Sequence, residues 1–222
     1  MSHVSPTIGI LGGTGALGSG LAYRWNTAGL KVVIGSRNPE SAAAAASKIS
    51  DLTGHADIIS GASLQECAAA ADVIVVAVPW DAHRETVEII KSESLGKVIL
   101  DVVSPLGGGP GGLRALKPES GSACQEAQDI LVDSHVIGGF HHVSAVKLSD
   151  SESASVETDV MIVGDNDEAL AVVEDLVAQI PGMRAIRSGK LINASAVEGL
   201  TANLISANRY YKTHAGVRVT GI

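Results

Sequence analysis

The chain has few aromatic residues, few cysteines and no excess of positive charge. Phe, Trp and Tyr make up 3% of its 222 residues, so Val, Ile, Leu and Ala must form most of the core, which suits the buried strands of a parallel sheet. Cys67 and Cys124 have neither C-x-x-C spacing nor disulfide-rich density, which favours buried thiols in a reducing cytoplasm. A net charge of −8 argues against non-specific nucleic-acid binding, because a polyanion is repelled on average.

Long apolar runs, export signals and hydrolytic motifs are also missing. The longest strongly apolar run, Val73 to Trp80, is too short to span a bilayer, and Met1 to Pro6 lacks the features of a signal peptide. We therefore expect no membrane association. No G-x-S-x-G nucleophile elbow is present, and neighbouring strand residues such as His141 and His142 point to opposite faces. The sequence therefore predicts no catalytic nucleophile and no metal site.

Apolar runs alternate with helix-like segments through the first two-thirds of the chain. This alternation predicts βαβ units and an α/β fold, a Rossmann doubly wound parallel sheet. Right-handed crossovers favour the strand order 3-2-1-4-5-6, with a crevice above strands one and four. The expected strands are 7–12, 31–35, 56–60, 72–79, 97–103 and 136–141, and the expected helices are 16–28, 40–52 and 64–71.

The segment after the fifth strand breaks this alternation. Ser104 to Gly112 is so rich in glycine and proline that we expect neither helix nor strand. It would lie at the carboxyl edge of the sheet, either as a plain connector or as a mobile flap over a second ligand.

A polar, turn-like stretch near residue 150 divides the chain into two domains, 1–150 and 151–222. The second is expected to be a small C-terminal α/β domain beside the sixth strand. Its elements are predicted as strand 159–164, helix 168–180, strand 183–186 and a long last helix over about 190–214.

The most informative motif is Gly13-Thr-Gly-Ala-Leu-Gly18, which fits the dinucleotide fingerprint G-x-G-x-x-G. It lies between the first strand and the first helix, as the fingerprint requires. Gly13 would permit the tight turn, Gly15 would let the backbone approach a pyrophosphate, and Gly18 would let the helix pack on the strand. The helix N-terminus then offers free N–H groups to the phosphates. The segment predicts a dinucleotide site.

The end of the second strand indicates which dinucleotide is bound. NAD-binding units carry a carboxylate there for the ribose 2′-hydroxyl, whereas this chain has Ser36-Arg37 and no carboxylate before Glu40. A guanidinium matches the oxygens of a 2′-phosphate, and Ser36 adds a hydroxyl. We therefore expect NADP rather than NAD, and assign 1–150 as the NADP-binding domain.

Together these residues resemble one family, the NADPH-dependent reductases of coenzyme F420. The resemblance extends over nearly the whole chain, and its more specific segments are Gly35-Ser-Arg37 and Val78-Pro-Trp80. The others are Leu11–Gly18, Val103–Leu106, His141–Ala145, Val163–Asp165 and Val197–Thr201.

The resemblance implies reversible hydride transfer between NADP(H) and F420. A Rossmann domain binds NADP, and the small C-terminal domain helps to hold the 8-hydroxy-5-deazaflavin ring against the nicotinamide. It implies four groups of cofactor-binding residues: Thr14, Gly15, Ala16 and Leu17 at the pyrophosphate; Thr14, Ser36 and Arg37 at the 2′-phosphate; Val78, Pro79 and Ala82 beside the ribose and nicotinamide; and His141, Val143 and Ala145 where the two rings face each other.

The chain departs from the family pattern at two places. Ser41 stands where relatives can carry a lysine, and His142-Val-Ser144 stands where they can show Thr-Ile-Pro. The first departure weakens the expected grip on the 2′-phosphate, and the second affects the backbone at the deazaflavin face. His141 is left with three interpretations: polarising a ring carbonyl, relaying a deazaflavin proton, or a hydrogen-bonded histidine at a strand end.

The charge of the C-terminal tail suggests how the deazaflavin is attracted. From Arg184 onward the chain has six Lys and Arg residues against one acid, Glu198. From this charge alone we infer that Arg209 and Lys212, with Arg184 and Arg187, attract the anionic phosphate and oligoglutamate tail of F420.

Two other functions remain open, an NADP-dependent reductase of a small imine or carbonyl and a non-catalytic NADP-sensing module. The near-heptad spacing of apolar Val197, Leu200, Leu204 and Tyr211 also favours a homodimer.

Overall fold

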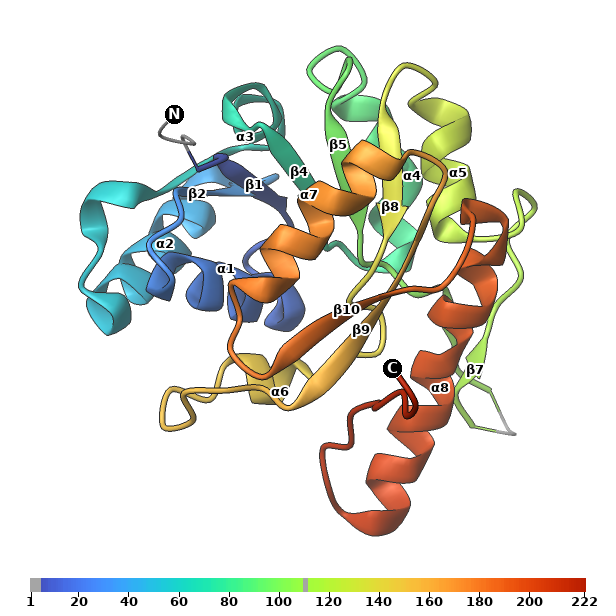
Figure 1. The fold of residues 1–222 in the computed structure, drawn as a ribbon. Helices are drawn as coiled ribbons and strands as arrows, with labels where there is room; N and C mark the ends of the chain where they lie inside the picture. Colours follow the sequence, from blue (N-terminus) through green and yellow to red (C-terminus); the bar gives the residue numbers. More distant parts are fainter. Residues whose placement is uncertain (1–4, 110–111) are drawn as a thin grey trace.

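An eight-stranded sheet runs through the molecule with helices on both faces (Figure 1). The structure is a computed structural model and describes residues 5–109 and 112–222, so most of the segment Met1 to Pro6 lies outside the described residues. Its strands are β1 (Ile8–Leu11), β2 (Val32–Ser36), β3 (Ile59–Ser63), β4 (Val73–Val76), β5 (Val98–Asp101), β8 (His135–Gly138), β9 (Thr158–Gly164) and β10 (Met183–Arg187).

The strand order is β10-β9-β8-β5-β4-β1-β2-β3. The six strands from β3 to β8 are mutually parallel and have the predicted order 3-2-1-4-5-6, so the doubly wound arrangement is confirmed. The order reverses between β1 and β4, where Ile10 lies level with Val75. That reversal opens a crevice at the carboxyl edge of the sheet.

The strands of the tail extend this same sheet. β9 pairs antiparallel with β8, and β10 pairs parallel with β9, so the predicted strands 159–164 and 183–186 are both present. The helix between them, α7 (Asp167–Ala178), starts and ends within two residues of the prediction.

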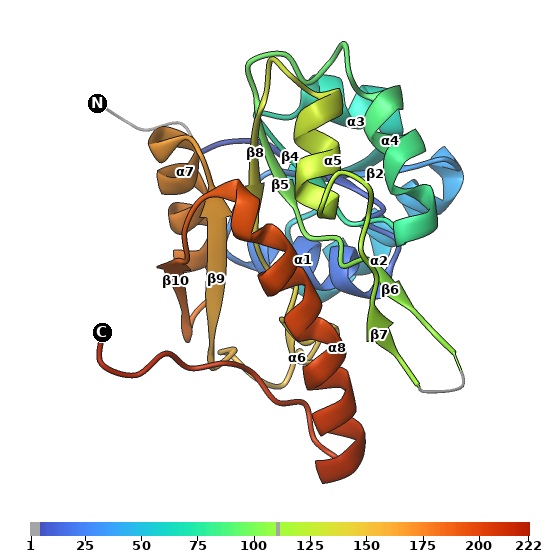
Figure 2. The same cartoon turned by 90° about the vertical axis from the view of Figure 1, so that its right-hand side faces the viewer.

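Helices cover both faces of the sheet, and each face has its own apolar core. On one face lie α1 (Ala16–Thr27), α2 (Pro39–Thr53), α6 (Ala145–Leu148) and α7. On the other lie α3 (Leu64–Ala70), α4 (His83–Ile89), α5 (Ala123–Ile130) and α8 (Ala194–Tyr211). Figure 2 shows α8 beside the sheet, with its C-terminal half projecting from the body. Among the described residues, none of the helices is both long and apolar enough to cross a membrane.

Several boundaries differ from the predictions because of contacts that the local pattern does not show. Residues Ala56–Ile58 form a 3-10 turn, η1, and the third strand begins at Ile59. The backbone of α2 lies so close to Gly61 that a Cβ there would be 2.3 Å from the carbonyl carbon of Ala42. The position of β3 therefore depends on the close contact between Gly61 and α2. Similarly, the last helix is divided into η3 (Leu191–Asn193) and α8.

The sixth strand ends three residues before its predicted end. β8 stops at Gly138, and Phe140 adopts a left-handed backbone conformation with a φ of 59°. The Phe140 ring is fully buried against the edge of Trp25, with 5.8 Å between ring centroids. This packing turns His141 and His142 away from the strand direction.

The prediction that Ser104 to Gly112 contains no strand is wrong at one point. Leu106–Gly107 forms β6, which pairs with β7 (Arg114–Ala115) in a small antiparallel hairpin. A second contact fixes its base, because the N–H of Leu116 donates to the carbonyl of Pro105 at 2.8 Å. Residues 110 and 111 of this segment lie outside the described residues.

One buried arginine holds the segment after α6 on α1. Arg24 is 6% exposed and its guanidinium donates to the carbonyl oxygens of Lys147, Leu148, Asp150 and Ser153 at 2.7–2.9 Å. The last carbonyl oxygens of a helix have no hydrogen-bond partner within the helix. Here the charged guanidinium supplies hydrogen bonds to four carbonyl oxygens at and after the end of α6. Arg24 thereby fixes Ala145 and its neighbours beside the start of α1.

Candidate functional site

The glycine-rich turn between β1 and α1 is built on close backbone contacts. The left-handed residue is Gly12, with a φ of 81°, and not Gly13, which the fingerprint predicts as the turn position. Gly13 is needed for another reason, since a Cβ there would lie 2.9 Å from the Cγ2 of Ile34. At Gly18 a Cβ would lie 2.7 Å from the carbonyl oxygen of Gly12, so the close contact of the helix at Gly18 is with the turn after β1 and not with the strand that the fingerprint predicts.

Gly15 is less crowded than Gly12, Gly13 and Gly18. It precedes α1 in an extended conformation, and a Cβ there would be 3.3 Å from the nearest atom, the carbonyl oxygen of Gly12. Thr14, Gly15 and Ala16 are all exposed. The first N–H groups of α1 therefore face an open surface at the carboxyl edge, where the positive end of the helix favours an anion.

A hollow of about 270 Å³ lies in front of this turn. Its floor is the turn itself, one side is the end of β2 with Ser36 and Arg37, and the other side is the segment after β4 with Val78, Pro79 and Ala82. The structure thus brings together seven of the predicted residues: Thr14, Gly15, Ser36, Arg37, Val78, Pro79 and Ala82. Gly13 is buried beneath the turn.

A second hollow of about 300 Å³ adjoins the first, and the two share Gly15, Ala77, Val78 and Pro79. It extends along Ala16 and Leu17 to Trp80, to Val102–Ser104 after β5, and to His141 and Thr201. The predicted residues Ala16, Leu17 and His141 therefore line this second hollow. We call the two adjoining hollows together the mouth. Among the described residues that line these two hollows, Thr201 of the second hollow alone comes from α8.

Thr201 of α8 ties the walls of the second hollow together. Its hydroxyl donates to the carbonyl oxygen of His141 at 2.9 Å and lies 2.9 Å from the hydroxyl of Ser104. Three elements far apart in the sequence are thus joined at the mouth. Val143 is packed in the core below it, 7% exposed.

A third, shallower hollow continues from Ala16 along α6. Ala145, Lys147 and His214 line it, and Lys147 and His214 also border a further hollow rich in serine hydroxyls. Of the predicted residues, Ala145 lies here. Lys147 and the hydroxyls of Ser144, Ser153 and Ser155 lie here together with the carboxylates of Asp150 and Glu157, so groups of both charges border this path.

The basic residues of the tail have different environments. Arg184 pairs with Asp159, and Arg187 pairs with Glu174 and Asp167, so these two guanidinium groups stabilise the tail itself. Arg209 and Lys212 are exposed at the end of α8, which projects away from the body in Figures 1 and 2.

A group of buried ionisable residues behind the mouth was missed by the sequence analysis. His83 is fully buried, and its ring nitrogens lie 2.7 Å from Asp101 Oδ2 and 3.1 Å from Glu126 Oε1. Burial opposes a charge on the ring, but the two carboxylates outweigh it and raise the pKa of His83 from 6.5 to about 9. The one local sign was Asp101, a carboxylate that ends an otherwise aliphatic strand.

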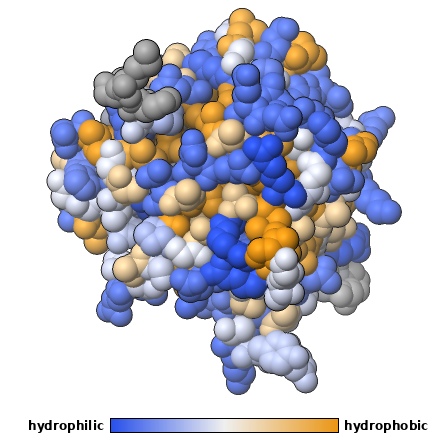
Figure 3. Space-filling view, in the orientation of Figure 1, coloured by the Kyte–Doolittle hydropathy of each residue, from blue (hydrophilic) through white to orange (hydrophobic). Residues whose placement is uncertain are grey.

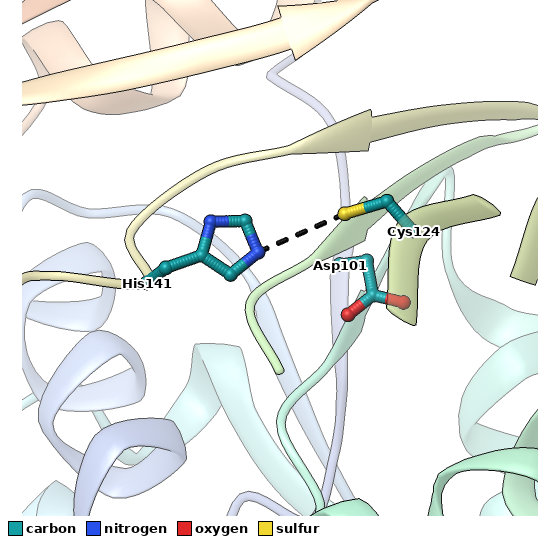
Figure 4. Close-up of side chains that lie close together, drawn as sticks. All are labelled: Asp101, Cys124 and His141. Atoms are coloured by element: carbon teal, nitrogen blue, oxygen red, sulfur yellow. Dashed lines mark hydrogen bonds between the residues drawn. The ribbon is translucent and has the colours of Figure 1, made fainter. Parts of the chain in front are cut away.

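His141 has the opposite electrostatic character. Its burial lowers its pKa to about 4, although Asp101 opposes the shift, so the ring is neutral near pH 7. Figure 4 shows its Nε2 directed at the thiol of Cys124, 3.7 Å away. Its Nδ1 is buried without a hydrogen-bond partner in the described part of the chain. His142 faces elsewhere and accepts a hydrogen bond from the N–H of Met161 at 3.2 Å.

Asp101, Cys124 and His141 lie close enough to resemble a metal site, with one ligand atom of each within 4.8 Å of the others (Figure 4). Existing hydrogen bonds account for this cluster. Asp101 accepts from His83 and from the N–H of Val103 at 3.0 Å, and burial raises the pKa of the Cys124 thiol well above its usual value.

The raised pKa of His83 predicts how the stability of the fold changes with pH. A raised pKa in the folded state adds stability that is complete below pH 6.5 and is lost as the pH rises through about 9. We therefore expect the thermal midpoint to fall by several degrees, of order ~5 °C, over this interval. Thermal melts of wild type and His83→Gln between pH 6 and 10 test this. The variant should lack this decline, and an identical decline in both proteins would contradict the assignment.

Comparisons with known proteins agree with this geometry. Residues 7–105 match the family model described as NADP oxidoreductase, coenzyme F420-dependent. The chain is 38% identical over 221 residues to the F420-dependent NADP reductase of Methanothermobacter thermautotrophicus, covering 97% of this chain and 95% of that protein. It is 36% identical to the protein of the same name from Methanocaldococcus jannaschii, covering 97% and 98%.

A solved structure shows the same fold. It is a putative F420-dependent NADP reductase from Arthrobacter sp. FB24, with a TM-score of 0.82 and 21% identity, covering 96% of this chain and 99% of that one. At this identity the likeness concerns the fold alone.

Proposed function

The chain belongs to the family of F420-dependent NADP reductases, and we propose that it exchanges a hydride between NADP(H) and F420 across the mouth described above. The observation that carries this proposal is the pair of adjoining hollows that share Gly15 and Val78–Pro79. One is suited to a phosphorylated dinucleotide, and the other is suited to a second ring placed against it.

The first hollow fits NADP(H) by its donors and by its open backbone. The N-terminus of α1 and the bare Gly15 would receive the pyrophosphate, and Ser36 and Arg37 would bind the 2′-phosphate. Val78, Pro79 and Ala82 would then lie beside the ribose and nicotinamide. When bound, the nicotinamide supplies a hydride that the deazaflavin accepts together with a proton, so the protein itself needs no nucleophile.

The second hollow would hold the deazaflavin ring. His141 and Ala145 border its path, and the core packing of Val143 supports the backbone between them. Lys147 and His214 continue that path outward. The exposed Arg209 and Lys212 would attract the anionic tail of F420 from a distance rather than line the ring site.

The division of labour between 1–150 and 151–222 is part of this proposal. The first hollow is lined by residues 12–86, whereas the second adds Thr201 and the third adds His214. The first segment would thus bind NADP, and the second would complete the deazaflavin site. Because both cysteines are free and buried, we also propose a reducing, cytoplasmic location.

A homodimer through α8 is a further part of the proposal. Val197 is buried in the chain's own core, but Tyr210 and Tyr211 at the end of the helix are 80% and 72% exposed. The face in Figure 3 shows apolar side chains in islands among hydrophilic ones, and the two exposed tyrosines make the projecting end of α8 the candidate surface. Light scattering that gives the mass of a single chain would refute this.

A spectroscopic assay tests the function. Mixing the protein with NADPH and oxidised F420 should bleach the deazaflavin absorbance band, because the hydride reduces the ring. No bleaching, with NADPH binding confirmed by fluorescence, would refute the proposal. The same assay without F420, using a panel of small imines and carbonyls, distinguishes the alternative reductase: NADPH consumption there would favour it.

A further inference from the structure

Trp80 and His83 form two layers behind one wall of the mouth. Trp80 opens the 3-10 turn η2 (Trp80–Ala82) directly after Pro79, and His83 opens α4. Their rings are stacked, with 5.4 Å between centroids and 30° between planes. Trp80 is half-buried and lines the second hollow, whereas His83 is fully buried. The histidine is therefore the support on which the tryptophan ring rests.

Hydrogen bonds from two further elements hold the His83 ring. Nε2 lies 2.7 Å from Asp101 of β5, and Nδ1 lies 3.1 Å from Glu126 of α5. Both nitrogens face carboxylate oxygens, so both must donate, and the ring cannot turn without losing a charged hydrogen bond. Glu126 is itself held by Arg84, whose Nη2 is 2.7 Å from its second oxygen.

Asp101 connects this support to the opposite wall. Its second oxygen accepts from the N–H of Val103 at 3.0 Å, and Val102, Val103 and Ser104 line the same hollow as Trp80. The neighbouring ionisable groups are Cys124 and His141, near Asp101, and Glu198, which accepts from the N–H groups of Ala123 and Cys124 at 3.1 Å. One network thus fixes two sides of the second hollow.

A gain in the free energy of unfolding is not enough to explain why the protein has such a network. Buried ion pairs recover little more than the cost of removing their charges from water, and apolar residues of similar volume often stabilise as well. Their advantage is a single defined geometry. Hydride transfer depends on such geometry, since a displacement of about 1 Å can cost about 100-fold in rate.

We propose that His83, clamped by Asp101 and Glu126, is a positioning residue for hydride transfer: it fixes Trp80, and with it the Val78–Trp80 wall, against the nicotinamide. The inference rests on the proposed function. His83 is not among the described residues that line either hollow, and it acts by setting the distance and angle at which the two rings meet.

The test compares His83→Gln and Glu126→Gln with a matched control, His135→Gln, which alters an exposed histidine at the start of β8. The measurements are kcat per NADPH-binding site, KM for NADPH, and the isotope effect with NADPH deuterated at the transferred position. For His83→Gln we expect kcat to fall about 10- to 100-fold while KM changes less than about 3-fold, because ground-state binding is retained and alignment is lost. The isotope effect should rise, since hydride transfer becomes limiting.

Each outcome is decisive. Glu126→Gln has nearly the same shape and keeps one oxygen that can accept a hydrogen bond, so we expect it to fold and to loosen one side of the clamp. It should show the same pattern with a smaller loss, about 3- to 10-fold, and it decides the matter should His83→Gln fail to fold. Normal kcat per site and an unchanged isotope effect in the folded variants would overturn the inference. A loss of binding sites without a change per site would mean a structural role only, and would overturn it too. A wild-type protein that transfers no hydride would instead overturn the proposed function.

Discussion

Gly15→Val is expected to abolish NADPH binding while leaving the protein folded. Gly15 lies in an extended conformation open to any residue, with φ −78° and ψ 164°, and a Cβ would have 3.3 Å to its nearest neighbour. The carbonyl oxygen of Gly12 must shift by a few tenths of an ångström to admit this Cβ, and helix capping is weakened, so we expect a stability cost of about 1 kcal/mol. The two γ-methyl groups would occupy the junction of both hollows. We expect NADPH affinity to fall at least about 100-fold, because the pyrophosphate loses charge-assisted hydrogen bonds to the turn.

The control for this prediction is Gly18, a nearby glycine that is closely surrounded by backbone atoms. In Gly18→Ala the new Cβ would lie 2.7 Å from the carbonyl oxygen of Gly12 and 2.9 Å from the Cα of Gly13, so the smaller substitution should cost more stability. Fluorescence titration with NADPH and thermal melts separate the two effects. If Gly15→Val binds NADPH as wild type does, the backbone does not receive the pyrophosphate here.

The dinucleotide turn could be predicted from the sequence because its determinants are local. Gly12 to Gly18 contact one another or the strands on either side, and aliphatic β1 and β4 identify themselves by composition. The strand order followed from the rules of parallel crossovers. Even here the local pattern predicted Gly13 as the residue that permits the tight turn, whereas the structure has Gly12 in the left-handed conformation. The crowding at Gly12 comes from Ala77, which follows β4 and is distant in sequence.

The buried network could not be predicted, because its members are distant in sequence and chemically ordinary one at a time. His83 is 18 residues from Asp101 and 43 from Glu126. Only the folded sheet brings α4, β5 and α5 together. The boundary at Phe140 has a similar cause, since its left-handed backbone reflects packing on Trp25 rather than any local signal.

Arg37→Ala is expected to weaken NADPH much more than NADH. Arg37 is exposed directly after β2 and lines the first hollow beside Ser36. None of the ion pairs among the described residues involves it, so its guanidinium is available to a ligand. Losing a charged hydrogen bond costs about 1.5–3 kcal/mol, which corresponds to a loss of roughly 10- to 100-fold in NADPH affinity. NADH lacks the 2′-phosphate and should bind the variant as it binds wild type.

The size of this effect follows from the residue at position 41. Ser41 offers no second cation in the first turn of α2, so in the proposed complex Arg37 would carry most of the charge that meets the 2′-phosphate. Arg37→Lys is the matched variant, because it keeps the charge and loses the planar pair of donors, and its NADPH affinity should fall between those of wild type and Arg37→Ala. Titrations of all three proteins with both nucleotides decide the question. Equal losses for NADPH and NADH would exclude contact with the 2′-phosphate, since the only difference between the two ligands is that group.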